Sequence, residues 1–342
     1  VFSNGQVGLT TNFILKEGGD TNEGSVSYST SDYNLQRFDG VYSGKLAEDF
    51  YYMIGGYVSS SPGVRDAGYE AEQGHQLTIN LTKKLENGKL NLWNRSTNDY
   101  GTWYLPQMLD TKTIKTGLKD DYTQVGPKNR QVTILASQPN GSGGSIYKPE
   151  NIDLGDGRGW KGDITGGSVD LELADGWNFA DRFSLTKGQV FTHGLVRSQS
   201  AKLVSSITTS TNVTTVSGAP VAPTDVVQLH GPWIVEKDIQ DFNNDISLSK
   251  KWDSFKLTLG EYSAVTSTKD NWALGKFKWY QLKHDGEQLD PATIPDVSCQ
   301  AADQVSCGFS YDLNASGNTH ENAFYVAGQI FMDEWTFDLG AR

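Results

Sequence analysis

The chain has 342 residues, enough for one large β domain or two ordinary domains. With 29 basic and 41 acidic residues its formal net charge is −12 and its pI is about 4.9, which argues against a nucleic-acid partner. No run of residues approaches the roughly 20 apolar residues of a membrane helix, which excludes a membrane protein crossed by helices.

The composition suits a barrel better than a compact soluble domain. Glycine (37), tyrosine (15) and tryptophan (9) are abundant, which is typical of many strands, many turns and aromatic belts. The hydrophobic fraction of 37% is low for a water-soluble core in a chain of this size. A barrel with a wet interior has the same deficit, because half of its strand positions face water.

The chain begins with short strands joined by tight turns. It opens at Val1 with neither an initiator methionine nor a secretion signal, so we expect a processed precursor or a portion of a larger polypeptide. Three strands are then predicted over residues 25–29, 38–46 and 50–58, with tight turns at 33–34 and 47–49.

The clearest element is the stretch from Gly74 to Arg95, where apolar and polar side chains alternate on both sides of a turn at residues 86–88. This pattern predicts a β-hairpin with one apolar face and one polar face. In a membrane barrel the apolar face contacts lipid and the polar face lines the lumen. We expect lipid contact for Leu77, Ile79, Leu81, Leu90 and Leu92, and the lumen for Asn80, Asn91 and Arg95.

Downstream, tight turns alternate with long loops. Strands are predicted over residues 164–173, 183–185, 245–249, 255–259, 324–326 and 335–339, with tight turns at 174–176, 252–254 and 333–334. The other connections are far longer than usual, and we expect them at about 106–160, 192–240 and 266–320. The count reaches roughly eleven strands, and short turns at one end with long loops at the other favour a membrane barrel over a soluble sandwich.

The faces of the later strands fit a barrel with one exception. Asp170 and Glu172 point away from the apolar face of their strand, which a water-lined lumen tolerates and a dry core does not. Asp181 shares parity with apolar neighbours, so we expect a bulge there or a strand that begins later. Aromatic residues lie near the tight turns, at the level of an interfacial girdle: Phe50, Trp177, Trp252 and Trp335.

Several segments, in order, resemble the TonB-dependent outer-membrane receptors. Residues 6–19, QVGLTTNFILKEGG, are similar to the last segment of that family's plug, with Val7 and Leu9-Thr10 where glycines are more usual. Four further stretches resemble a proteobacterial branch of the family: Gly63–Tyr69, Asn98-Asp99 with Tyr104-Leu105-Pro106, Asn244–Lys250 and Asp333-Glu334-Trp335.

The resemblance implies an all-β fold, a transmembrane antiparallel barrel of twenty-two strands around an N-terminal plug. Residues 1–21 would be the C-terminal end of the plug and residues 22–342 the first half of the barrel. Half a barrel leaves unpaired edges in lipid, so we expect the remaining strands in the same or another chain. The resemblance also implies a Gram-negative outer membrane, contact with its lipid, and a TonB-type energy-coupling protein acting through a segment not in this chain.

The sequence offers no pattern for catalysis, a cofactor or a metal. The five histidines are scattered without metal-ligand spacing, and no nucleophile elbow or phosphate-binding motif occurs. The Asp-rich stretch from Asp153 to Asp163 fits no EF-hand spacing, which favours a solvated turn over a calcium site. We therefore expect a protein that is not an enzyme and that holds no cofactor or metal.

The two cysteines, Cys299 and Cys307, lie close together in the third long loop. A disulfide suits an oxidising compartment and a surface loop, so we predict one between them. Two free thiols are the alternative.

Aromatic residues with hydrogen-bond donors beside them mark the candidate ligand contacts. Flat rings stack on sugars or aromatic chelators, and arginine pairs with carboxylates. The same residues could instead pack the loops or mark the outer interface of the membrane. The candidates are Trp103, Tyr104, Arg158, Trp160, Trp272, Trp279 and Tyr280.

These features predict a receptor for active uptake of a bulky scarce nutrient, a ferric siderophore or an oligosaccharide, across the outer membrane. Two alternatives stay open at this point. One is a passive porin or structural barrel, against which the plug-like opening segment counts. The other is a secreted β-rich glycan-binding protein without any membrane.

Overall fold

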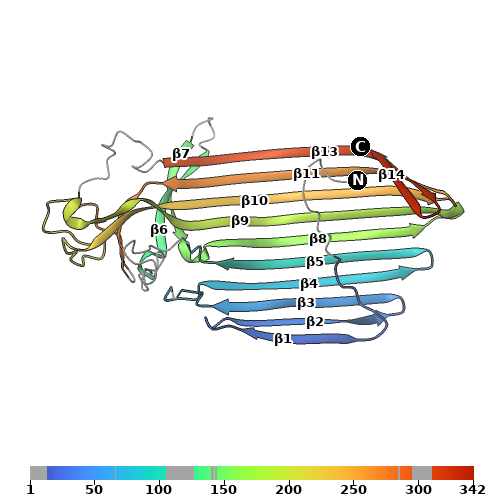
Figure 1. Ribbon diagram of the computed structural model, residues 1–342, viewed down its shortest axis with the longest axis horizontal. Helices are drawn as coiled ribbons and strands as arrows, with labels where there is room; N and C mark the ends of the chain where they lie inside the picture. The colour runs from blue at the N-terminus through green and yellow to red at the C-terminus, as the bar shows by residue number, and fades with distance from the viewer. Residues whose placement is uncertain are drawn as a thin grey trace.

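The structure is a computed structural model that describes residues 14–65, 67–104, 127–139, 142, 145–283, 286–294 and 310–342. Within this part, twelve antiparallel strands form one continuous sheet and two more form a separate hairpin (Figure 1). The predicted all-β antiparallel class is confirmed. No helix in the described part of the chain is long and apolar enough to cross a membrane.

Eleven strands follow one another across the sheet, with only the β6–β7 hairpin and the short β12 left off the path, which agrees with the predicted number. They are β1 (Glu23–Thr30), β2 (Gln36–Ala47), β3 (Phe50–Ser61), β4 (Glu72–Leu85), β5 (Gly88–Gly101), β8 (Arg158–Glu172), β9 (Trp177–Leu203), β10 (Val226–Lys251), β11 (Phe255–Gly275), β13 (Ser310–Met332) and β14 (Trp335–Ala341).

The remaining elements lie in the connections. The hairpin of β6 (Gln131–Pro139) and β7 (Ser145–Asp153) lies between β5 and β8 in the chain, and β12 (Lys278–Gln281) pairs with the start of β10. Four short 3-10 helices complete the described structure: η1 (Pro127–Asn129), η2 (Leu154–Asp156), η3 (Ala174–Gly176) and η4 (Val204–Ser206). Among the described residues β1 and β14 do not pair with each other, so the sheet is an open wall.

Tight turns and long connections lie at opposite ends of the sheet (Figure 1). Asp49, Asp175 and Asp333 take positive φ angles of 55°, 55° and 50° in three of the tight turns, a conformation that Asp tolerates better than most residues. The turn between β4 and β5 holds only residues 86 and 87. The predicted asymmetry between the two ends is therefore present.

Two of the predicted loop boundaries, 192–240 and 266–320, are wrong, because the strands continue well into them, whereas the first, at about 106–160, is close to the gap between β5 and β8. β8 begins at Arg158, and the largest changes are in β9, β10, β11 and β13. Backbone hydrogen bonds extend these strands although their side chains no longer alternate between apolar and polar. Where the apolar band ends, the paired residues on the outward face of β5, β8, β9, β10 and β11 are all polar. A search for apolar–polar alternation therefore misses the continuing strands: the residues are Ser96, Asp163, Lys187, Gln240 and Ser267.

The hairpin that was clearest in the sequence has the predicted faces. Leu77, Ile79 and Leu92 are 46%, 40% and 50% exposed, and they do not pack into a closed core. Asn80, on the other face, is 1% exposed. We call the face of the exposed leucines the outward face of the sheet and the opposite one the inward face.

Asp181 lies on the outward face without a bulge, contrary to the prediction. β9 begins at Trp177, and Asp181 pairs in register with Val169 of β8 and Ile246 of β10. An unbroken alternation places it beside apolar neighbours. The exception in the sequence is thus a true outward-facing carboxylate.

Two small apolar cores lie at the long-loop end, on opposite faces of β10. On the outward face, the β6–β7 hairpin crosses the ends of β11 and β13 (Figure 1) and buries Ile152 and Leu154 against Ile234. On the inward face, Leu229 packs with residues of the 204–225 connection and of segment 286–294. The long connections therefore form a folded cap on the sheet.

Candidate functional site

The inward face of the sheet holds an extended segment of the chain. Asn80 Nδ2 donates a hydrogen bond to the carbonyl oxygen of Lys16 at 3.0 Å. The Lys89 ammonium donates to Glu17 Oε1 at 3.0 Å, and the Tyr51 hydroxyl donates to Asp20 Oδ1 at 2.8 Å. Three separate strands thus fix residues 16–20 against the inward face. The predicted division between residues 1–21 and 22–342 stays a prediction.

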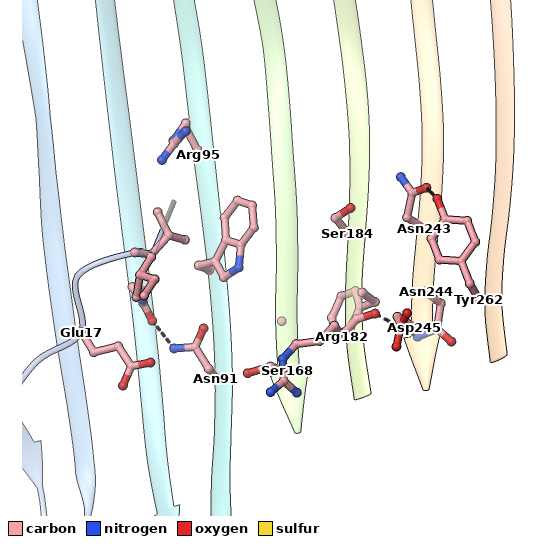
Figure 2. A pocket seen from close by; sticks show the side chains of 16 residues that line it. Glu17, Asn91, Arg95, Ser168, Arg182, Ser184, Asn243, Asn244, Asp245 and Tyr262 are labelled. Atoms are coloured by element: carbon pink, nitrogen blue, oxygen red, sulfur yellow. Dashed lines mark hydrogen bonds between the residues drawn. The ribbon is translucent and has the colours of Figure 1, made fainter. Parts of the chain in front are cut away.

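A cavity of about 570 Å³ lies between this segment and the inward face (Figure 2). Its lining mixes polar side chains with apolar ones, and β4, β5, β8, β9, β10 and β11 contribute to it. The Tyr262 hydroxyl donates to Asn243 Oδ1 at 2.7 Å, and the buried Nε of Arg95 has no hydrogen-bond partner among the described residues. Such a surface suits water or a polar ligand, as the predicted lumenal orientation of Asn80, Asn91 and Arg95 requires.

A second inward cluster lies toward the long-loop end of the sheet. The Arg158 guanidinium lies over the ring of Trp103 at 4.9 Å, a cation–π arrangement. Trp160 is the next inward residue along β8. Three glycines make room for the rings: a Cβ atom on Gly194 would be 2.8 Å from the Trp103 ring, and one on Gly162 or Gly188 would be 2.7 or 2.6 Å from the Trp160 ring.

Beside this cluster, a cavity of about 400 Å³ is lined by Arg37, Asp99 and Arg158 among others. Arg37 makes a two-nitrogen contact with Asp39, its Nη2 donating to Oδ1 at 2.7 Å, and its guanidinium lies 3.8 Å from the centre of the Tyr57 ring. The Tyr57 hydroxyl donates to Asp99. Two guanidinium groups with flat rings beside them can hold an anionic or aromatic ligand.

The structure brings together three of the seven predicted ligand contacts, Trp103, Arg158 and Trp160. Tyr104 lies apart, since its hydroxyl donates to the carbonyl oxygen of Arg65 at 2.8 Å and so holds the β3–β4 loop. Trp272, on the inward face of β11, packs against Tyr311 with ring centres 6.1 Å apart.

Trp279 and Tyr280 are buried in the two apolar cores of the cap, on opposite faces of β12. Their rings fill these cores and leave little surface for a ligand. Cys299 and Cys307 lie outside the described residues, so their disulfide stays a prediction.

Arg37 and Tyr57 were not singled out from the sequence, and Asp99 was named only for the family resemblance and not as a ligand contact. Each occupies an inward position in its strand, so the polar-inward parity of β2, β3 and β5 carried a signal for them. Alternation along a strand shows which face a residue occupies, but it does not show that these three residues contact one another, because that contact depends on how β2 to β5 are aligned.

A half-buried acidic cluster around the buried His193 joins the β6–β7 hairpin to the wall. His193 Nε2 and Glu236 Oε1 are 3.0 Å apart, and His193 is 6% exposed. Burial first, and then the charge of Glu236, raise the pKa of the Glu150 carboxyl on β7. Burial and the charge of Asp153 likewise raise the pKa of Asp156. No group of three His, Cys, Asp or Glu in the described ranges has the geometry of a metal site.

The stretch from Asp153 to Asp163 is ordered by its own contacts. Asp153 caps η2 by accepting a hydrogen bond from the Gly155 backbone N–H at 2.8 Å, and it also accepts one from Arg130 Nε at 2.7 Å. Asp163 lies farther along, on the outward face of β8. The stretch is therefore a capped turn at Asp153 that leads into β8, and Asp153 and Asp163 do not point to one common site.

Comparison with known proteins places the fold but not the family. No family model matches the chain, and no curated protein matches it. Among solved structures, the FpvAI–pyocin S2 complex aligns with a TM-score of 0.54 and 9% identity over 95% of this chain. The siderophore receptor PiuA from Acinetobacter baumannii aligns with a TM-score of 0.52 and 11% identity over 95% of this chain.

The chain has the fold that FpvAI and PiuA share. It spans 38% of the length of the first structure and 42% of the second. At these identities the likeness concerns the arrangement of strands, and the residues of the inward clusters must be judged on their own geometry.

Proposed function

We propose that this chain is part of the wall of an outer-membrane receptor of the TonB-dependent type that takes up a ferric siderophore. The observation that carries the proposal is the two-faced sheet. One face exposes leucine, isoleucine and phenylalanine side chains as a lipid-facing band does, and the other is polar and holds an extended segment of the chain against it. A siderophore receptor among the structural neighbours supports the substrate class.

In this proposal Arg158, Trp103 and Trp160 contact the ligand, with Arg37 nearby. Their guanidinium groups and rings suit the carboxylate, hydroxamate or catecholate groups that chelate iron, and the rings would also stack on a sugar. An oligosaccharide is therefore the second substrate class to test. The receptor breaks no covalent bond of its ligand.

The remaining parts of the machinery lie outside this chain in the proposal. Further strands, from the same or another polypeptide, close the barrel, because an open sheet edge is untenable in lipid. A TonB-type protein supplies energy through a segment elsewhere. Residues 16–20 are attached to the inward face, which fits a lumen occupied by a plug better than the open lumen of a porin.

Uptake of radiolabelled ferric siderophores by cells that produce the complete protein tests the proposal. We expect accumulation of one siderophore class that stops when the proton-motive force is collapsed. Accumulation that is insensitive to the proton-motive force, with an open conductance in planar bilayers, would indicate a porin. A protein that stays monodisperse without detergent would exclude the membrane altogether.

Variants on β8 test the ligand contacts. A charge-assisted hydrogen bond contributes about 1.5–3 kcal/mol, so Arg158→Ala should weaken ligand binding by roughly tenfold to a hundredfold. Lys161→Ala removes a positive charge from the opposite face of the same strand and should leave binding unchanged. Equal losses in both variants would show that the effect is one of overall charge and not of this contact.

A further inference from the structure

Five polar side chains interrupt the apolar band on the outward face of β9 to β13. Asp181, Ile246 and Glu261 form one row across the sheet, and Asn244, Ser263 and Asn322 form the next row. We call Asp181, Asn244, Glu261, Ser263 and Asn322 the outer polar patch. Toward the tight turns it is bounded by Leu259 and Val326, and toward the long loops by Phe242 on β10, Val265 on β11 and the polar His320 on β13.

The patch contains the same arrangement twice. Asn244 Nδ2 on β10 donates to Asp181 Oδ1 on β9 at 2.5 Å, and Asn322 Nδ2 on β13 donates to Glu261 Oε1 on β11 at 2.7 Å. In each case the carboxamide lies diagonally across from the carboxylate on the neighbouring strand. The two carboxylate–carboxamide pairs are two strands apart, which is about 10 Å at the usual strand spacing.

These groups are costly where they lie if only lipid covers them. Charged and polar groups on the lipid face of a barrel are destabilising, most of all toward the middle of the band. An ionised carboxylate offers about four acceptor positions, and the described contacts occupy one on Asp181 and one on Glu261. The patch therefore needs further hydrogen-bond donors from outside this sheet.

We propose that the outer polar patch is the contact surface between two copies of this protein in the plane of the membrane. The proposal rests on the membrane placement given under Proposed function. A two-fold contact requires a surface that carries its own complement. The patch meets this condition, since it offers carboxylate acceptors together with amide and hydroxyl donors.

The duplicated pair fits a two-fold axis that runs along the membrane normal, in front of the boundary between β10 and β11. Rotation about an axis lying between the facing copies brings the Asp181–Asn244 pair of one copy opposite the Glu261–Asn322 pair of the other. The second N–H of each carboxamide and the Ser263 hydroxyl then have acceptors across the contact. The flanking apolar residues add buried surface on both sides of the polar centre.

Cysteine crosslinking in the outer membrane of intact cells tests the contact. Ser263→Cys places a thiol at the centre of the patch, in a protein whose Cys299 and Cys307 are replaced by serine. Leu77→Cys, on the outward face of β4 in the same apolar band, is the matched control. We expect a disulfide-linked homodimer from Ser263→Cys under mild oxidation and only monomer from Leu77→Cys.

A second variant separates the contact from folding. Asp181→Leu with Glu261→Leu replaces both carboxylates by side chains that suit lipid, so the barrel should fold and insert normally. Crosslinking of the Ser263→Cys thiol should be lost in that background. Retained crosslinking would mean that the carboxylates do not form the contact and would overturn the proposal.

The outcomes also distinguish this proposal from the proposed function. A Ser263→Cys protein that inserts, takes up its ligand and stays monomeric under oxidation would refute the dimer and leave the receptor intact. Crosslinks from the introduced thiol to a different membrane protein alone would refute the second copy as the partner. A protein that does not associate with the membrane would refute both.

Discussion

Replacing Ile79 by arginine measures directly whether the outward face of β4 contacts lipid. Ile79 is 40% exposed on that face, and Leu85, on the same strand and face, is 37% exposed beside the tight turn. The six residue steps from Ile79 to Leu85 span about 20 Å along a strand, or about 15 Å along the membrane normal at a tilt of about 40°. Ile79 should therefore lie near the middle of a band about 25 Å tall, and Leu85 near its edge.

The two positions should respond very differently to the same substitution. An arginine on the lipid face costs about 2–4 kcal/mol at the middle of the bilayer and about 0–1 kcal/mol near the interface. We expect losses of that size in the free energy of unfolding for Ile79→Arg and Leu85→Arg, measured by urea titration of the protein in phospholipid vesicles. If this face were in water, both would stay within about 0.5 kcal/mol, and small, equal losses would refute the lipid contact.

Two further predictions concern the docked β6–β7 hairpin, and amide hydrogen exchange checks both. The raised pKa of Glu150 means that docking is strongest below the carboxyl's ordinary pKa of 4.5 and weakens as pH rises through the raised value. Glu150→Gln should therefore increase protection of the hairpin at pH 7 and leave it unchanged in acid, and equal protection at pH 7 would contradict this. Leu154 is fully buried beneath the hairpin, so Leu154→Ala should lower the free energy of docking by about 2–5 kcal/mol while β1 to β5 keep their protection; global loss of protection would contradict a separate core.

Much of the sheet could be predicted because its signals are local. The period-2 alternation from Leu77 to Leu92 fixed the faces of β4 and β5, and short Asp-containing turns such as the one at Asp333 fixed where strands reverse. Both depend on neighbouring residues alone. The same alternation placed Asn80 and Arg95 on the inward face before any contact was known.

The strand boundaries were predicted wrongly where the outward and inward faces of the sheet lie in similarly polar surroundings. Beyond Lys187 on β9 and before Gln240 on β10, polar residues occupy the outward face as well, so alternation fades while backbone pairing continues. The β6–β7 hairpin lies within a predicted loop, although Val132, Ile134 and Ala136 share one face of β6, because the apolar Leu135 between the last two breaks the apolar–polar alternation. A nine-residue strand inside a predicted loop of about fifty residues was too weak a signal beside it.

The candidate site was predicted in part for a related reason. The sequence predicts Trp103, Arg158 and Trp160 as candidate ligand contacts from their residue types. Their proximity in space depends on the pairing of β5 with β8 across a long connection, which the sequence does not show. For Asp181 the sequence predicts a bulge or a strand that begins later, because a carboxylate in an apolar row is costly. The structure places it outward in an unbroken strand.

The two-faced wall is tested most directly by a spin-label scan of β4 in the outer membrane. Labels at positions 76 to 82, one at a time, report accessibility to oxygen, which concentrates in lipid, and to a water-soluble nickel complex. High oxygen accessibility at positions 77, 79 and 81, and low values at the even positions between them, are the predicted result. Oxygen accessibility that is the same at all seven positions, or high nickel accessibility at positions 77, 79 and 81, would contradict a membrane-facing wall.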